Sequence, residues 1–187
     1  MAPLSTPASA LFPLFPGARH SRIETHWPFV ADALREDRLE SGLIVAYALG
    51  TIAAETAGFE PISERPSKWN TKKTPFDLYD GRANLGNKHP GDGAKFKGRG
   101  FIQLTGRTNY ARIGDRLSVD LLANPELANE PRTAARILAL FVADREARIL
   151  DALHADNLPV ARKIVNGGTH GMDRFTTTYR GALELFR

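Results

Sequence analysis

The most informative stretch of this sequence is residues 98–110, which read GRGFIQLTGRTNY. Gly98 and Gly100 permit a tight backbone that a ligand can approach closely, because glycine has no Cβ. The pattern predicts a short hairpin or extended segment over 97–105, followed by a helix over 107–117.

Three short polar side chains in the same stretch are candidates for binding. Gln103, Thr105 and Asn109 carry amide or hydroxyl groups that can hold a water molecule or a ligand amide. These three residues are therefore candidate site residues.

Upstream, Glu55 lies near the end of the strongly apolar segment 43–57, which predicts a helix buried on most faces. Two environments fit this carboxyl group. It is either an exposed position at the edge of the helix, or a partly desolvated group whose pKa is raised because burial disfavours the charge. The second environment suits a general acid, which has to be protonated near neutral pH.

A second carboxyl group, Glu64, follows nine residues later, where Pro61 has already ended the helix. Hydrolysis of a glycoside with inversion needs two carboxyl groups roughly 6.5–9.5 Å apart, with a water molecule beside one of them. A carboxyl at a helix end and one in a loop can provide that gap. Glu60 is a competitor for the second role, and the spacing does not choose between them.

Together with the ETAGF stretch at 55–59, the 98–110 string resembles the catalytic core of family 19 glycoside hydrolases, which includes chitinases and phage endolysins. The resemblance covers about residues 43–180. It implies a mainly α, lysozyme-like, two-lobed helical domain with a substrate cleft and at most a small β-hairpin. It also implies an inverting, single-displacement mechanism without a metal or cofactor.

The resemblance assigns roles position by position. Catalytic roles fall on Glu55 as general acid, Glu64 as the second carboxylate and Thr105 as the residue that holds the attacking water. Substrate-binding roles fall on Gln103, Asn109, Asn166 in the IVNGG segment at 164–168, and Arg174 in a later DR-x-x-x-x-Y segment. The chain departs from the family at Ala54, where a histidine usually precedes the acid, and it lacks the cysteines that form disulfides in the plant enzymes.

The rest of the chain predicts a helical protein in one catalytic domain, 19–187, preceded by an N-terminal arm, 1–18. An irregular region over 60–98 is too long for a simple connection and is typical of a functional loop. Further helices are expected over 21–38, 132–150, 159–167 and 172–186.

Composition excludes several classes of protein. No run of about 18 apolar residues is present, so no stable membrane insertion is expected. The net charge of +4 and pI near 9.6 suit an anionic partner, but no basic stripe with interleaved aromatic residues indicates nucleic acid. The five histidines lack metal-ligand spacing, so no metal site is expected. We expect a monomer.

Some side chains have two interpretations. Trp69 and Tyr79 suit either sugar stacking or core packing. Structural ion pairing is favoured over sugar binding for Arg99 and Arg107. Trp27 is expected in the core.

The substrate class stays open between two polymers. The compact form, the basic balance and the absence of cysteine favour a cell-wall hydrolase that cuts peptidoglycan, as endolysins do, and a chitinase of the same fold is the alternative. A lytic transglycosylase and an inactive carbohydrate-binding protein are further alternatives. The N-terminus has four prolines and no basic residue before Arg19, unlike an ordinary secretory signal. A phage-encoded enzyme would therefore stay in the cytoplasm until it is released to the cell wall or periplasm.

Overall fold

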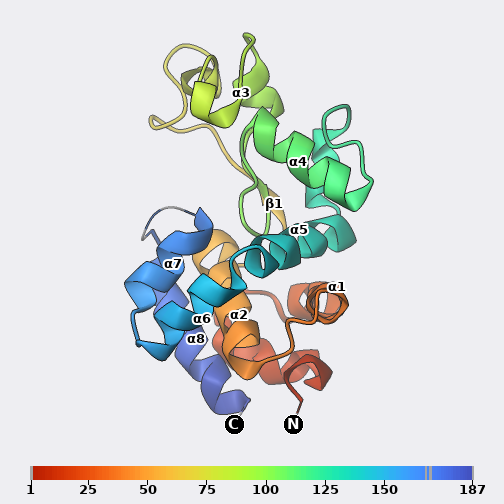
Figure 1. Ribbon diagram of the computed structural model, residues 1–187, viewed down its shortest axis with the longest axis vertical. Helices are drawn as coiled ribbons and strands as arrows, with labels where there is room; N and C mark the ends of the chain where they lie inside the picture. The colour runs from red at the N-terminus through yellow and green to blue at the C-terminus, as the bar shows by residue number, and fades with distance from the viewer. Residues whose placement is uncertain (1, 167, 169, 187) are drawn as a thin grey trace. The chain divides into compact units, whose positions relative to one another are not determined.

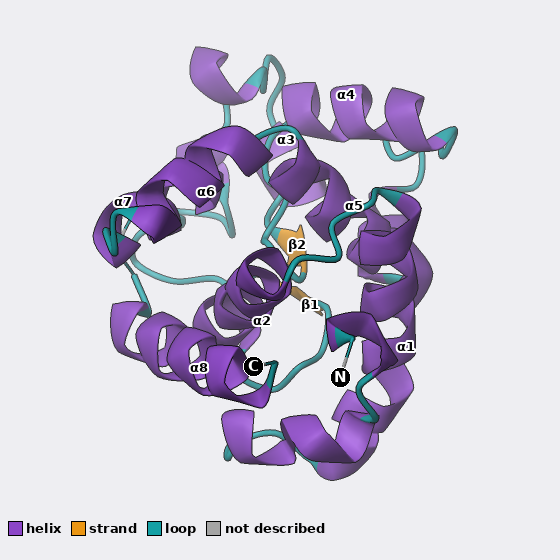
Figure 2. Cartoon of the chain, turned by 60° about the horizontal axis from the view of Figure 1, so that its bottom comes forward, coloured by secondary structure: helices purple, strands orange, loops and turns teal. Residues whose placement is uncertain are grey.

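The computed structural model describes residues 2–166, 168 and 170–186, and the chain divides into two compact units. The first unit is Met1–Glu60 with Leu138–Arg187, and the second is Pro61–Ile137. Helices dominate, and the described residues hold one two-stranded sheet (Figure 2). The mainly α fold class is therefore confirmed. The division into an arm at 1–18 and a single domain at 19–187 stays a prediction.

The first unit is built around one apolar helix, α2, which packs against α8 (Figure 1). Apolar and small side chains occupy nearly every position of α2, so its buried surface extends around the whole helix. The helices of this unit begin and end within two residues of the predicted positions. The helices that match a prediction are α1 His20–Glu36, α2 Gly42–Thr56, α7 Leu158–Asn166 and α8 Met172–Leu185. Three further helices, which the sequence did not predict as separate elements, are η1 Pro3–Ser5, η2 Ala8–Leu14 and α6 Glu146–His154.

The ends of α2 explain where this helix stops. The Ser41 hydroxyl accepts a hydrogen bond from the Ile44 backbone N–H at 3.3 Å and caps the first turn. At the other end Ala57 adopts the left-handed conformation, with φ of 52°. The residue that ends the helix is thus Ala57, one position before Gly58, which was expected to end it.

The N-terminal residues pack against the first unit. Leu4, Leu11 and Phe15 are buried, and the Trp27 indole donates to the Thr6 carbonyl oxygen at 2.8 Å. Trp27 is itself buried, which confirms its predicted place in the core.

The second unit holds the sheet and shorter helices. Its elements are β1 Ile62–Ser63, η3 Asp77–Tyr79, η4 Ala83–Leu85, α3 Asp92–Lys95, β2 Arg99–Gly100, α4 Arg107–Leu117 and η5 Pro125–Asn129. The two strands are antiparallel, with Ile62 opposite Gly100, and a bridge between Arg99 and Leu104 closes a tight hairpin. The hairpin and the helix that follows it were both predicted.

The single helix predicted over 132–150 is wrong, because two helices occupy this region. Helix α5, Pro131–Ala143, contains the boundary between the units, and α6 begins at Glu146. The Arg145 guanidinium donates to the Phe141 carbonyl oxygen at 3.2 Å, which satisfies an acceptor at the end of α5. Neither glycine nor proline marks this break, so the apolar periodicity gave no sign of it. No helix in the described part of the chain is long and apolar enough to cross a membrane.

Candidate active site

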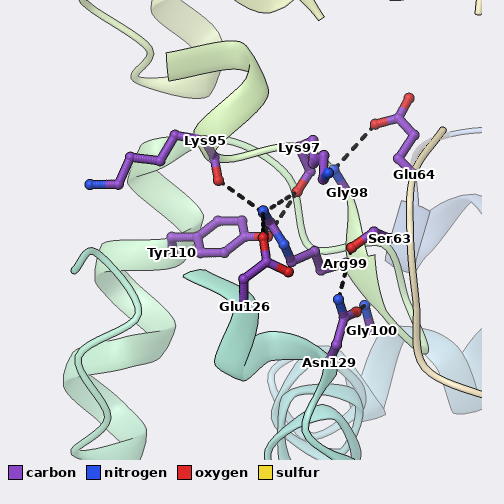
Figure 3. Close-up of polar contacts among 10 residues, drawn as sticks. All are labelled: Ser63, Glu64, Lys95, Lys97, Gly98, Arg99, Gly100, Tyr110, Glu126 and Asn129. Atoms are coloured by element: carbon purple, nitrogen blue, oxygen red, sulfur yellow. Dashed lines mark hydrogen bonds and ion pairs between the residues drawn. The ribbon is translucent and has the colours of Figure 1, made fainter. Parts of the chain in front are cut away.

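The predicted site residues fall in both units, and each group is described within its own unit. In the second unit, Glu64 directly follows β1, and hydrogen bonds hold both of its carboxylate oxygens. Oε1 accepts from the Asn70 amide and from the Tyr79 hydroxyl, each at 2.8 Å. Oε2 accepts from the Gly98 backbone N–H at 3.2 Å (Figure 3). Three donors from three segments therefore fix the orientation of this carboxylate.

The two side chains that donate to Glu64 are themselves fixed. Burial, followed by the hydrogen bond to Glu64, raises the pKa of Tyr79 to about 12, so its hydroxyl keeps its proton at neutral pH. The Asn70 amide oxygen accepts from the Ser67 backbone N–H and the Thr71 hydroxyl, which directs the amide nitrogen to Glu64. The sequence reasoning missed Asn70, because an asparagine in a loop carries no local signal of its partner.

Gly98 lies where the 98–110 stretch meets Glu64. A Cβ at this position would lie 2.8 Å from Gln103 Oε1 and 3.3 Å from Glu64 Oε2, so no other residue fits without displacement. The Gln103 amide nitrogen donates to the Ile62 carbonyl oxygen at 2.9 Å. The second unit thus brings Glu64 and Gln103 close to the same glycine.

Thr105 lies two residues before α4, and Asn109 lies in the first turn of that helix. The Thr105 hydroxyl donates to the Gln103 carbonyl oxygen, and the Asn109 amide nitrogen donates to the Thr105 carbonyl oxygen, both at 2.8 Å. These hydrogen bonds tie both side chains to the backbone next to Gln103. Their roles in holding water and substrate stay predictions.

Arg99 lies at the centre of a network of hydrogen bonds and an ion pair (Figure 3). Its side chain is only 2% exposed; it forms an ion pair with Glu126 and donates to the Lys95 carbonyl oxygen and the Tyr110 hydroxyl, both at 2.9 Å. Arg107 likewise forms an ion pair, with Asp92 at 2.6 Å. The structural interpretation of both arginines is therefore confirmed.

An asparagine that the sequence analysis did not single out holds the two strands together. Asn129 donates to the Ser63 hydroxyl at 2.8 Å and accepts from the Gly100 backbone N–H at 3.0 Å (Figure 3). It thereby fixes the register that places Glu64 beside Gly98.

In the first unit, Glu55 occupies the last turn of α2. Its side chain is 9% exposed, and Oε1 lies 2.5 Å from Nη2 of Arg162, which is fully buried in α7. Arg162 also donates to the His170 carbonyl oxygen at 3.1 Å. Glu55 is therefore largely buried and not at an exposed edge of the helix, and a cation lies beside its carboxylate. A partner 107 residues away leaves no local signal in the sequence.

Arg174 contacts the end of the same helix. Its guanidinium donates to the carbonyl oxygens of Ala53 and Ala54 at 3.1 and 3.2 Å, which caps the terminus of α2 beside Glu55. Ala54 is buried, and its Cβ lies 3.1 Å from the position of a Cβ on Gly171. Ala54 and Gly171 therefore pack closely together at the end of α2.

The last predicted binding residue, Asn166, ends α7, and its side chain lies outside the described part of the structure, as do Gly167 and Thr169. Among the described residues, no group of three or more His, Cys, Asp or Glu side chains could hold a metal ion.

Part of the chain is similar in sequence to a known protein. A protein of Haemophilus influenzae described as a glycosyl hydrolase family 19 domain-containing protein is 31% identical over 108 residues. The match spans 57% of this chain and half the length of that relative. No family model matches the chain.

Solved structures extend the likeness to nearly the whole chain. Chitinase C from Streptomyces griseus matches 98% of this chain and 76% of its own, with a TM-score of 0.64 and 16% identity. A bacterial family 19 chitinase matches 96% of this chain and 95% of its own, with a TM-score of 0.63 and 17% identity. The fold is therefore that of the family 19 chitinases. The chain is thus similar to family 19 glycoside hydrolases in sequence over 108 residues and in fold over nearly its whole length, which confirms the resemblance seen in the sequence.

Proposed function

We propose that this chain is an inverting glycosidase that cleaves β-1,4 bonds in polymers containing N-acetylglucosamine, with the glycan strands of peptidoglycan as substrate. The observation that carries the proposal is the Glu64 carboxylate, which three donors hold in one orientation within a family 19 fold. A general base requires such a fixed orientation, because the proton it takes has to lie within hydrogen-bond reach.

The proposed reaction is a single displacement. Glu55 gives its proton to the glycosidic oxygen as the bond from that oxygen to the anomeric carbon breaks. Glu64 takes a proton from a water molecule whose oxygen bonds to the same carbon from the opposite face, with Thr105 orienting the water. One new reducing end forms per cleavage. Arg162 holds Glu55 in place, and Arg174 holds the helix end that carries it.

Peptidoglycan is favoured over chitin by charge. The chain carries a net charge of +4, peptidoglycan bears carboxylates on its peptides, and chitin is uncharged. Chitin is the second candidate, because the solved structures with this fold are chitinases. An inactive carbohydrate-binding protein is disfavoured, since Glu55 and Glu64 are both present.

The test measures clearing of purified Gram-negative sacculi together with newly formed reducing ends. We expect Glu55→Gln and Glu64→Gln each to lose at least about a hundredfold in rate. Glu24→Gln, an exposed substitution on α1, is the matched control and keeps full activity. Circular dichroism at the assay temperature is needed, because Glu55→Gln also takes the carboxylate away from the buried Arg162.

Each other result has a definite meaning. Release of oligomers from chitin and not from sacculi would move the substrate to chitin. Clearing without new reducing ends would indicate a lytic transglycosylase. A wild-type chain that binds both polymers and cleaves neither would be a carbohydrate-binding protein.

A further inference from the structure

The segment 65–76 carries an unbalanced charge. It contains four cations and no acidic residue, and all four cationic side chains are exposed. Within the described residues, none of the four forms an ion pair. They are Arg65, Lys68, Lys72 and Lys73.

A large aromatic ring lies in the middle of this segment. Trp69 is 75% exposed, whereas the other tryptophan of the chain is buried. An indole is costly to leave in water, and such rings commonly mark binding surfaces. The Lys68 ammonium group lies 4.9 Å from the ring centre, so positive charge already adjoins the aromatic surface.

The backbone that presents these side chains is held in place. Asn70 is buried and bonds to Ser67 and to the Arg65 carbonyl oxygen. The Asp77 carboxylate accepts three consecutive backbone N–H groups, those of residues 72–74, at 2.6, 2.8 and 3.1 Å. A fixed backbone lowers the entropy lost when a ligand binds.

The same segment is joined to the proposed active site. Asn70, which directly follows Trp69, donates to Glu64 Oε1 at 2.8 Å. A polymer that reaches Glu64 would therefore pass close to the exposed ring and its cations, because the residue that carries the ring directly precedes a donor to that carboxylate.

We propose that residues 65–73, the basic-aromatic loop, form a subsite that selects an anionic glycan: Trp69 stacks on a sugar ring while Arg65 and the lysines bind carboxylates of the peptidoglycan peptides. The inference rests on the proposed glycosidase function and adds its specificity. Stacking on a sugar face requires no charge, so the ring serves either polymer, and the cations distinguish peptidoglycan from chitin.

The test is sedimentation of the full chain with sacculi, with sacculi whose carboxyl groups have been amidated, and with chitin. The Glu55→Gln background prevents cleavage during the measurement. The test variant is Lys68→Gln/Lys72→Gln/Lys73→Gln, and Trp69→Ala is measured separately. The matched control removes three exposed arginines of the first unit, as Arg19→Gln/Arg148→Gln/Arg180→Gln.

We expect the lysine variant to bind sacculi about tenfold more weakly at low salt, and the control less than about twofold more weakly. The stronger binding of wild type relative to the lysine variant should vanish in high salt and on amidated sacculi. Salt screens the charge interaction, and amidation removes the carboxylates. Binding to chitin should be unchanged in the lysine variant and weaker in Trp69→Ala.

Equal losses in the lysine variant and the arginine control would overturn the proposal, since net charge alone would then explain binding. Equal loss on chitin would do the same. Competition by duplex DNA at the same concentration as soluble peptidoglycan fragments would assign the loop to phosphates instead. Binding does not require turnover, so a chain that binds through this loop and never cleaves would refute the glycosidase proposal alone.

Discussion

The Tyr79 hydroxyl and the Asn70 amide donate to the same oxygen of Glu64, each at 2.8 Å. One carboxylate oxygen thus accepts two fixed side-chain hydrogen bonds from residues 6 and 15 positions away. The orientation of Glu64 can therefore be tested separately from the stability of the loop. If Tyr79 no longer donates to Glu64, Asn70 still holds the loop through its own hydrogen bonds.

Tyr79→Phe removes one donor to Glu64 and keeps the ring. A hydrogen bond to a charged group contributes about 1.5–3 kcal/mol, so the turnover number on the polymer should fall about tenfold or more while the KM changes little. The check is a full kinetic analysis that measures the turnover number and the KM of Tyr79→Phe and of wild type on the polymer. A change confined to KM would show that Tyr79 contacts the sugar and does not position Glu64.

Gly98→Ala tests the close packing around this glycine. The added methyl group would meet Gln103 Oε1 at 2.8 Å, and the flexible end of that side chain can move away. We therefore expect a stability loss below about 1 kcal/mol with at least about a tenfold loss of activity. Gly17→Ala, with no atom within 4 Å of the new methyl group, is the control for both measurements. An active Gly98→Ala enzyme would remove Gln103 from the site.

Arg99 and Glu126 form one ion pair whose two sides should respond differently. Arg99 is buried and also bonds to Lys95 and Tyr110, whereas the Glu126 side chain is 70% exposed. Arg99→Met should lower the free energy of unfolding by about 3–5 kcal/mol, and Glu126→Gln by less than about 1 kcal/mol. Urea denaturation of both variants compares the two values. Equal effects would mean that the ion pair, and not the buried hydrogen bonds, stabilises the hairpin.

The sequence predicted the secondary-structure elements better than the side-chain partners of the two carboxylates. Helix α4, the hairpin before it and the apolar α2 follow from local patterns of glycine and apolar residues, and all three were found. The break between α5 and α6 was missed, because the Arg145 side chain replaces the usual glycine or proline signal. The chemistry around each carboxylate was only half predictable. The motif resemblance predicts catalytic roles for Glu55 and Glu64, which stay predictions. Arg162 and Asn70 reach these carboxylates through tertiary packing, which no local pattern encodes.

Arg162→Met should affect stability and activity together. The buried guanidinium lies beside Glu55, and its loss leaves that carboxylate largely buried without its cation, a change that costs about 3–5 kcal/mol. Glu55→Gln/Arg162→Met removes both charges and should recover part of this stability without recovering activity. Thermal melts of the two variants provide the comparison. If the double variant is no more stable than Arg162→Met, the stabilisation by Arg162 comes from its hydrogen bond to the His170 carbonyl oxygen and not from its ion pair with Glu55.

Asp92 gives the second unit a stability that depends on pH. Arg107, and then the Lys88 and His89 backbone N–H groups, hold the pKa of this buried carboxyl well below its usual range. The folded state therefore prefers the carboxylate, and the stabilisation is present above the unfolded pKa, near about 4, and is lost as pH falls toward the folded pKa. Asp92→Asn should lower the free energy of unfolding by about 3–5 kcal/mol at pH 7, and its difference from wild type should shrink steadily below about pH 4.

The exposed substitution Asp151→Asn in α6 is the control, with no such trend. Urea denaturation at about pH 7, 5, 4 and 3 measures the difference in the free energy of unfolding between wild type and Asp92→Asn. A difference between wild type and Asp92→Asn that stays constant down to pH 3 would show that neutral hydrogen bonding, and not the charge on Asp92, stabilises this contact with Arg107.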